Sequence, residues 1–335
     1  MIDLQQRLES YFQRKYPRRA ASVCNVSMMP GGWEHEMFAF DLQHANSESE
    51  HFVLRLYAGT DAATASAKEF HCMQTLRDAD YPVPRLVALE RDTRHIGAPF
   101  VVMERINGQT LWPLIPNSTK ERQHELRTTY CQLFAQLHRM DWRLFDDFST
   151  SVDFGYPYAC IEDLLNEERE ILRVHGLSGF LPNLTWLEAR RADVPCQRPS
   201  IAHMDFHYQN ILLDQTDRMV VIDWAASRIT DPRMDLAWTL MLQQSHVNEE
   251  ERDILFSEYQ CQAQIDVDNI AWFEVLACLW RLQQFVTVLN GTSMRAAHPN
   301  ARQSMRDSIW AAKAAYEMLL ARTSLRIAEV DHLFS

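Results

Sequence analysis

The sequence predicts an α+β protein in two parts, a small β-sheet with one long helix followed by a larger and mainly helical part. Short alternating apolar segments fill the first third of the chain, as is typical of strands. From residue 119 onward, apolar residues recur at helical spacing. The length of 335 residues fits two domains or one protein of two lobes. We place the boundary near Glu104–Gly108, between residues 1–104 and residues 105–335.

In the N-terminal part, a helix is expected over residues 3–16, because Leu4, Leu8, Tyr11 and Phe12 share one face. Strands are predicted over residues 22–29, 37–42, 51–57, 86–90 and 99–105. Met29-Pro-Gly-Gly32 provides a turn between the first two strands. A helix is predicted over residues 61–79, and it ends before the breaker Tyr81-Pro-Val-Pro84.

In the C-terminal part, helices are predicted over residues 119–140, 159–174 and 183–191, and again from residue 231 onward. Residues 201–210 form a polar segment rich in histidine. Two short strands follow, over residues 211–213 and 219–222, joined by the turn Asp214-Gln-Thr-Asp217. The polar segment therefore leads directly into a hairpin.

Composition excludes several classes of protein. The formal net charge of −12 argues against a nucleic-acid partner, which would favour a basic surface. No apolar run reaches the roughly 18 residues of a membrane span. The N-terminus lacks the apolar core of a secretory signal. Seven scattered cysteines without a C-x-x-C pair indicate buried thiols in a reducing compartment. We therefore expect a cytoplasmic protein, and its oligomeric state stays open.

The strongest chemical signal is the segment His203-Met-Asp-Phe-His-Tyr-Gln-Asn210, followed by Ile222-Asp-Trp224 after the hairpin. Phosphoryl transfer depends on positioning and charge neutralisation. It needs one carboxylate at the acceptor hydroxyl, and a carboxamide and a second carboxylate to hold Mg²⁺ on the phosphates. The hairpin is expected to bring Asp205, Asn210 and Asp223 to one end of this part. The pattern matches the catalytic loop and metal-binding Asp of kinases.

These residues give the sequence a resemblance to the aminoglycoside phosphotransferase family, which has a protein-kinase-like bilobal fold and includes choline-kinase-like and homoserine-kinase-like relatives. The family loop typically reads His-Gly-Asp-x-x-x-x-Asn, and Ile-Asp-Trp is typical of its metal-binding segment. Asp231-Pro-Arg-Met-Asp-Leu-Ala237 matches a later family motif. Upstream, Tyr81-Pro-Val-Pro84, Val102-Met-Glu-Arg-Ile-Asn-Gly108 and Gln136-Leu-His-Arg139 also resemble family segments. The match covers roughly residues 25 to 240.

The resemblance implies an antiparallel sheet in the N-terminal lobe, a role for each matching residue, and Mg²⁺ with ATP or GTP as the phosphoryl donor. Asp205 would be the catalytic base or would orient the acceptor hydroxyl, and Asn210 and Asp223 would ligate Mg²⁺. Of the implied nucleotide-binding residues, Gly31 and Gly32 would cover the phosphates. Arg55 would contact the phosphates, with Glu69 as its ion-pair partner. Met103 would be the gatekeeper, and the backbone of Glu104 and Ile106 would bind the adenine.

Two residues depart from the family pattern. Arg55 stands where the family usually has lysine, and it keeps the positive charge with a fork suited to phosphate. Met204 replaces the usual glycine of the loop, where it either packs beneath the loop or shifts it. A nucleotide-binding scaffold or sensor with little catalytic activity is therefore the alternative to an enzyme. The retained Asp205, Asn210 and Asp223 favour the enzyme.

Several of these residues also have plain structural interpretations. His203 and His207 could suggest a zinc site, but no further histidine or cysteine stands nearby at ligand spacing. Asp231 is interpreted as a helix N-cap before Pro232, and Asp235 is given a structural role as well. Gly31-Gly32 could be a bare hairpin turn, and Arg55 with Glu69 an ordinary surface pair. Trp272, Leu276 and Trp280 have the spacing of a helix core.

The acceptor is expected to be a small molecule. Only about a dozen residues separate Asp223 from Asp235, too few for the activation segment with which protein kinases support a peptide. The acidic residues Glu162, Asp163, Glu167, Glu168 and Glu170 lie where the family often builds its acceptor pocket. They would suit an amine-bearing acceptor, and a solvated helix face is an equally good interpretation. The sequence does not name the acceptor.

Overall fold

The structure is a computed structural model that describes residues 2–15, 21–29, 36–44, 49–145, 152–265, 267–293 and 301–334. The chain forms two compact units. The first unit comprises Met1–Thr110 together with Ile211–Ala225, and the second comprises Leu111–Asn210 together with Ala226–Ser335. The chain therefore leaves the first unit, builds part of the second, returns for a short hairpin, and then completes the second.

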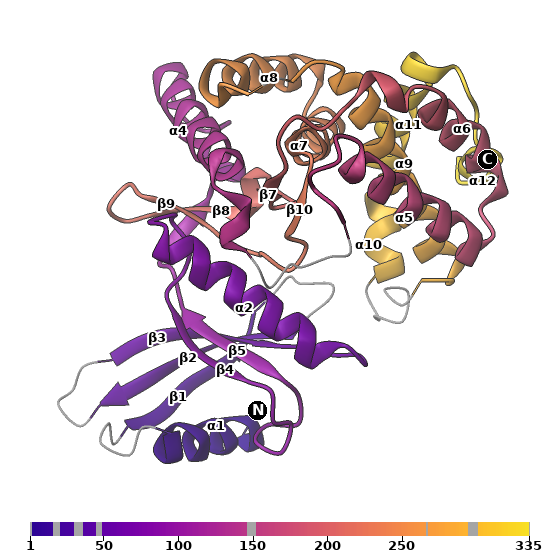
Figure 1. The fold of residues 1–335 in the computed structure, drawn as a ribbon. Helices are drawn as coiled ribbons and strands as arrows, with labels where there is room; N and C mark the ends of the chain where they lie inside the picture. Colours follow the sequence, from indigo (N-terminus) through magenta and orange to yellow (C-terminus); the bar gives the residue numbers. More distant parts are fainter. Residues whose placement is uncertain are drawn as a thin grey trace. The chain divides into compact units, whose positions relative to one another are not determined.

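The first unit is built on a five-stranded sheet in which every neighbouring pair of strands is antiparallel. In spatial order its strands are β1 (Ala21–Met28), β2 (Glu36–His44), β3 (Ser49–Leu56), β5 (Phe100–Glu104) and β4 (Leu86–Glu90). Helix α1 (Ile2–Lys15) lies against the sheet (Figure 1). Its Tyr11 packs on Phe100 and its Phe12 on Phe40. Alternating residues of β2 and β3 supply this core, so the predicted strands and helix of the N-terminal part are confirmed.

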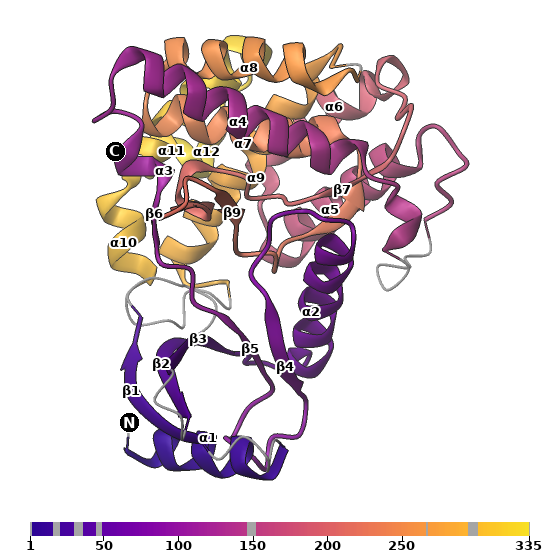
Figure 2. The same ribbon diagram turned by 90° about the vertical axis from the view of Figure 1, so that its left-hand side faces the viewer.

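Helix α2 (Ala62–Asp78) is the long helix of the first unit, and it runs beside β4 and β5 (Figure 2). Its buried side includes Glu69, Cys72, Met73 and Leu76. These residues are three or four positions apart and therefore share one face. A glutamate on this apolar face needs a charged or hydrogen-bonding partner inside the unit.

A second sheet of the first unit contains three antiparallel strands in the order β6 (Gly108–Thr110), β8 (Ile211–Asp214) and β9 (Met219–Val221). The β8–β9 hairpin was predicted, and its turn is held by Asp214, whose side chain accepts N–H bonds from Thr216 and Arg218. Strand β6 was not predicted. Gly108 is needed there, because a Cβ at this position would lie 2.4 Å from the carbonyl oxygen of Leu213.

The second unit is mainly helical. Its helices are α3 (Leu111–Leu114), α4 (Lys120–Arg139), α5 (Ala159–His175), α6 (Leu181–Ala189), α7 (Pro232–His246), α8 (Glu249–Ala263), α9 (Ile270–Asn290), α10 (Ala301–Asp307), α11 (Ile309–Thr323) and α12 (Ala328–Asp331). Helices α7 and α9 pack together at the centre, where most of their side chains are buried. Figure 2 shows α4 lying along α8. Trp272 and Leu276 of α9 belong to this core, as their spacing predicted.

One glutamate of the acidic stretch is buried in this core, so the solvated-face interpretation is wrong for it. Glu168 on α5 is fully buried and accepts a hydrogen bond from the side-chain amide of Gln283 on α9. Burial raises the pKa of Glu168 to about 8, against an ordinary value of 4.5. Near neutral pH the carboxyl group therefore binds a proton in the folded state and not in the unfolded state.

We expect Glu168→Gln to flatten the pH dependence of stability. The folded pKa of Glu168 lies above the unfolded value, so its stabilising contribution is present below about pH 4.5 and is lost as the pH rises through about 8. Urea denaturation midpoints between pH 5 and 9 should fall with pH in the wild type and fall less in the variant. Glu170→Gln, at an exposed position on the same helix, is the control and should keep the wild-type slope. Equal slopes in wild type and Glu168→Gln would contradict the assignment.

None of the helices that the structure describes is both long and apolar enough to cross a membrane. All seven cysteines carry free thiols, and six of them are buried or partly buried.

Candidate active site

The histidine-rich segment forms a loop in the second unit. Strand β7 (Ser200–Ala202) pairs antiparallel with β10 (Arg228–Thr230), with Ala202 opposite Arg228. The loop follows β7 immediately and ends in a short 3₁₀ turn, Tyr208–Asn210. Neither strand was predicted, because the three residues of each show no periodicity and no turn signal joins the two strands. The small sheet fixes the start of the loop.

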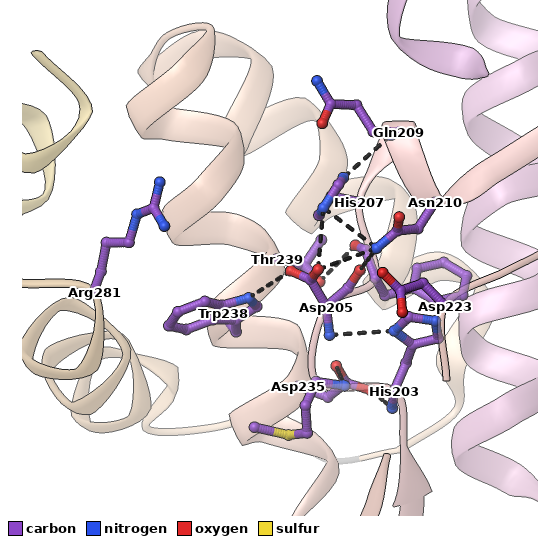
Figure 3. A network of polar contacts seen from close by, with 12 residues as sticks. His203, Asp205, His207, Gln209, Asn210, Asp223, Asp235, Trp238, Thr239 and Arg281 are labelled. Carbon is purple, nitrogen blue, oxygen red and sulfur yellow. Dashed lines mark hydrogen bonds and ion pairs between the residues drawn. The ribbon is translucent and has the colours of Figure 1, made fainter. Parts of the chain in front are cut away.

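Asp235 of α7 anchors the backbone of this loop (Figure 3). Its carboxylate accepts N–H bonds from His203 at 2.6 Å and from Met204 at 2.8 Å. Nε2 of His138, on α4, lies 3.1 Å from the same carboxylate. Asp235 and His138 have no exposed side-chain surface. The structural role predicted for Asp235 is thus to hold the loop. Asp231 caps α7, as predicted, by accepting the N–H of Arg233.

Met204 adopts the backbone conformation that a glycine would take. Its φ is +63°, in the left-handed region. Its side chain is buried and belongs to the core of the second unit. The sequence left two possibilities, that methionine packs beneath the loop or shifts it. The structure shows the packed arrangement, at the cost of a strained backbone.

We expect Met204→Gly to be more stable than Met204→Ala by about 1 kcal/mol. Both variants lose the buried side chain, a loss of roughly 1.5–3 kcal/mol. Only glycine relieves the left-handed strain of about 1–2 kcal/mol, which its greater chain entropy offsets in part. Thermal melts of the three proteins measure the difference. An alanine variant as stable as the glycine variant would show that the loop does not hold this conformation.

Asp205 presents its carboxylate at the end of a network of donors (Figure 3). Oδ1 accepts the indole N–H of Trp238 at 3.2 Å. Oδ2 accepts the side-chain N–H of Asn210 at 3.1 Å and lies 3.3 Å from Nε2 of His207. The side chain is 36% exposed. Burial by itself raises the pKa of Asp205, but the neighbouring His207 and His203 rings and the Trp238 donor outweigh burial and lower it below the ordinary value. The group is ionised and accessible.

Asn210 uses its amide nitrogen within the loop. Nδ2 donates to the backbone carbonyl of Asp205 at 2.9 Å as well as to the carboxylate. The carbonyl oxygen of the Asn210 side chain is consequently the atom that can serve as a metal ligand. Sequence spacing predicted Asp205 and Asn210 to flank a tight loop, and the structure brings their side chains together.

In the first unit, Arg55 and Glu69 form a buried ion pair. Nη1 of Arg55 lies 2.9 Å from Oε1 of Glu69, and Nη2 lies 2.9 Å from Oδ1 of Asp223. The surface-pair interpretation is therefore wrong, since Arg55 is 6% and Glu69 2% exposed. The Tyr57 hydroxyl donates to the other oxygen of Glu69. The pair is a fixed part of this unit.

The charged groups of this cluster shift one another's pKa values. Burial tends to lower the pKa of Arg55, but the Glu69 and Asp223 carboxylates outweigh burial and raise it above its ordinary value. Burial raises the pKa of Glu69, and the charge of Arg55 opposes that rise. Asp223 has φ of +66° and a side chain that is 46% exposed. Arg55 forms its ion pair with Oδ1 of Asp223. The second carboxylate oxygen of Asp223 is a potential metal ligand.

The other predicted nucleotide-binding residues are placed as follows. Met103 is buried near the end of β5, and Glu104 ends that strand. The backbone N–H of Glu104 donates to the carbonyl of Arg85, and its side chain accepts the N–H of Arg85. Ile106 follows in the connection to β6. Gly31 and Gly32 lie outside the described residues.

The donor atoms fit Mg²⁺. A carboxamide oxygen and a carboxylate oxygen are the hard ligands that Mg²⁺ prefers, and it commonly uses few protein ligands together with water and substrate phosphates. Within the described part of the chain, no group of three or more His, Cys, Asp or Glu side chains could hold a metal ion. Asn210 of the second unit and Asp223 of the first unit each offer one oxygen of this kind.

Sequence reasoning missed several side chains that hold the loop. Among them are Trp238 and Thr239 of α7, and His138 of α4. Thr239 donates its hydroxyl to the carbonyl of Phe206 at 2.8 Å. The signal that could have found Trp238 and Thr239 is spacing, because they stand three and four residues after Asp235 and therefore share its helix face.

The acidic stretch of α5 is largely occupied by intramolecular partners. Arg228 contacts Asp163 at 2.7 Å and also pairs with Glu167 at 2.5 Å. Glu162 accepts a hydrogen bond from Tyr156, and Glu170 pairs with Arg173. An amine-bearing acceptor would have to compete with Arg228 for Asp163 and Glu167.

Comparisons with known proteins indicate the family of this chain. A family model described as the phosphotransferase enzyme family matches residues 26–277. Among curated proteins, acyl-CoA dehydrogenase family member 10 of Mus musculus is 26% identical over 185 residues, which is 54% of this chain and 17% of that protein. Acyl-CoA dehydrogenase family member 11 of Homo sapiens is 25% identical over 178 residues, 51% of this chain and 22% of that protein. The chain thus spans less than a quarter of the length of these relatives.

Solved structures share the fold. A thermostable mutant of the aminoglycoside phosphotransferase APH(4)-Ia, in ternary complex with ADP and hygromycin B, has a TM-score of 0.63 at 16% identity, covering 93% of this chain and 97% of that one. The GDP complex of aminoglycoside 2'-phosphotransferase-IIIa has a TM-score of 0.63 at 15% identity, covering 93% and 99%. The predicted α+β, protein-kinase-like fold is confirmed. Because the family model covers most of the chain, this protein belongs to the phosphotransferase enzyme family.

Proposed function

We propose that this protein is a small-molecule kinase that transfers the γ-phosphoryl group of ATP or GTP to a hydroxyl group. The observation that carries the proposal is the Asp205 carboxylate. It is ionised and partly exposed, and donors engage both of its oxygens. A fixed carboxylate of this kind can accept a hydrogen bond from an alcohol and align that oxygen for in-line attack.

The remaining site residues take the roles that the family resemblance implies. Arg55, held by Glu69, would bind the phosphates, and Asn210 and Asp223 would bind Mg²⁺, which neutralises charge on the phosphates when present. The backbone of Glu104 and Ile106, with Met103, would meet the adenine.

The acceptor is proposed to be a small hydroxylated molecule. Two neighbours of this fold are described with aminoglycoside or macrolide phosphotransferase names, and at these identities they support the fold and leave the acceptor open. The Arg228 contacts to Asp163 and Glu167 argue for testing neutral and acidic alcohols beside amine-bearing acceptors. A cytoplasmic location stays a prediction from composition.

A panel of acceptors tests the proposal. Wild-type protein is supplied with Mg-ATP or Mg-GTP, and nucleoside diphosphate release is measured with aminoglycosides, amino alcohols, sugars and hydroxy acids. Release that depends on one acceptor class, with a phosphorylated product identified by mass spectrometry, supports the kinase. Tight Mg-nucleotide binding with no transfer to any class would favour the scaffold alternative. No nucleotide binding at all would overturn the assignment.

A further inference from the structure

Helix α7 holds four consecutive residues of the catalytic loop through three of its side chains. Asp235 binds the N–H groups of His203 and Met204, as described above. Trp238 donates to the Asp205 carboxylate, and Thr239 donates to the carbonyl of Phe206 (Figure 3). Residues at positions i, i+3 and i+4 share one face of a helix. This face therefore carries a matched set of donors and acceptors for the loop.

Trp238 differs from its two neighbours because it contacts the reactive side chain itself. Within the loop, Asp235 and Thr239 contact only backbone atoms. The indole N–H lies 3.2 Å from Oδ1 of Asp205. The tryptophan is 6% exposed and belongs to the core of the second unit, so its ring has little freedom to move. An indole N–H can donate and cannot accept, which suits an ionised oxygen.

We propose that Trp238 is a positioning residue for phosphoryl transfer, which sets the orientation of the Asp205 carboxylate. This inference rests on the proposed function of Asp205. Asn210 engages Oδ2 from the opposite side of the carboxyl group, with His207 nearby. With one donor on each oxygen, the carboxylate cannot turn about its terminal bond. The direction in which it accepts a hydrogen bond from the acceptor hydroxyl is then fixed before the acceptor arrives.

The competing explanation is that Trp238 is an ordinary core residue whose N–H needs any acceptor. Buried tryptophans usually find such a partner. Trp272 of α9 provides the comparison, because it is 3% exposed and its N–H donates to the backbone carbonyl of Leu187 at 3.0 Å. Both residues bury an indole in the same core and make one hydrogen bond. Only Trp238 directs its hydrogen bond to a carboxylate of the proposed site.

Kinetics of Trp238→Phe and Trp272→Phe separate the two explanations. Both variants lose a buried hydrogen bond, so both should melt at a lower temperature than the wild type. We expect Trp238→Phe alone to lower kcat, by roughly 10- to 100-fold, with the KM for Mg-nucleotide unchanged. Equal kcat values in the two variants and the wild type, per mole of folded protein, would overturn the proposal.

An isosteric replacement removes the concern that phenylalanine leaves a cavity. A benzothiophene side chain introduced at position 238 keeps the shape of the indole and replaces its N–H with sulfur. The proposal expects this protein to fold as the wild type does and to show the same fall in kcat as Trp238→Phe. Full activity with benzothiophene would show that the ring matters for packing and that the hydrogen bond does not position Asp205.

An NMR measurement keeps this inference distinct from the proposed function. The indole ¹H–¹⁵N resonance of residue 238, assigned from its loss in Trp238→Phe, should shift in Asp205→Ala, whereas the resonance of Trp272 should not. A shift without any phosphoryl transfer in the wild type would leave Trp238 holding Asp205 and would overturn the kinase proposal. An unmoved Trp238 resonance would overturn the contact itself, whatever the activity.

Discussion

Replacement of Asp205 by alanine should lower kcat by about 10²- to 10⁴-fold, the range typical of a group that handles the reacting proton. The variant removes the only carboxylate of the catalytic loop, and Asn210 and His207 lose their shared partner. Nucleotide affinity should stay near the wild-type value, because Asp205 is proposed to act on the acceptor hydroxyl and on the transition state. Steady-state kinetics and calorimetric titration with Mg-nucleotide measure the two quantities.

The matched control for Asp205→Ala is Asp253→Ala. Asp253 lies in the same unit and its side chain is 61% exposed. Removing it changes the net charge by the same amount without touching the loop, so kcat should be unchanged. An Asp205→Ala protein that turns over at the wild-type rate would show that Asp205 does not take part in the reaction.

Of the variants proposed, Asp235→Ala should lose the most free energy of unfolding, about 3–5 kcal/mol. The change leaves the N–H groups of His203 and Met204 without their acceptor and leaves His138 without its carboxylate inside the core. An unsatisfied buried donor costs about 1–3 kcal/mol. We expect a lower melting temperature and a lower kcat at temperatures at which the variant is still folded, because the loop loses its anchor.

Glu274→Ala distinguishes loss of stability from loss of loop geometry. Glu274 is 1% exposed and ion-paired with Arg252 and Arg322, so its removal also breaks a buried charge network in the second unit. It should destabilise the protein and leave the kcat of the folded fraction unchanged. If Asp235→Ala kept wild-type kcat in its folded fraction, Asp235 would stabilise the core without controlling the loop.

The strands and long helices of the fold could be predicted because their apolar residues have regular spacing. Strands β1 to β5 and helices α1, α2, α4 and α5 each bury one face, and that face is visible as a period in the sequence. Strands β6, β7 and β10 have three residues each, and their positions are fixed by pairing with distant segments. No local pattern contains that information.

The residues of the candidate site also divide into those that the sequence could predict and those that it could not. Asp205, Asn210 and Asp223 could be proposed from the sequence because phosphoryl transfer would require those groups in a recognisable order. Trp238 could not, because a tryptophan on an apolar helix is interpreted as core, and its contact with Asp205 depends on how α7 lies against the loop. The burial of Glu168 was missed for the opposite reason, since it stands among glutamates that are partly or largely exposed. Burial of a charged group depends on packing that spacing alone does not determine.

The most direct test of the central claim follows the phosphoryl group itself. Wild-type protein is incubated with Mg-ATP labelled at the γ-phosphorus and with each acceptor class, and the label is traced into acceptor, inorganic phosphate or protein. The account predicts label in a phosphorylated acceptor, with one diphosphate formed for each acceptor modified. Label recovered only as inorganic phosphate, at a rate that no acceptor changes, would contradict transfer to a small-molecule hydroxyl.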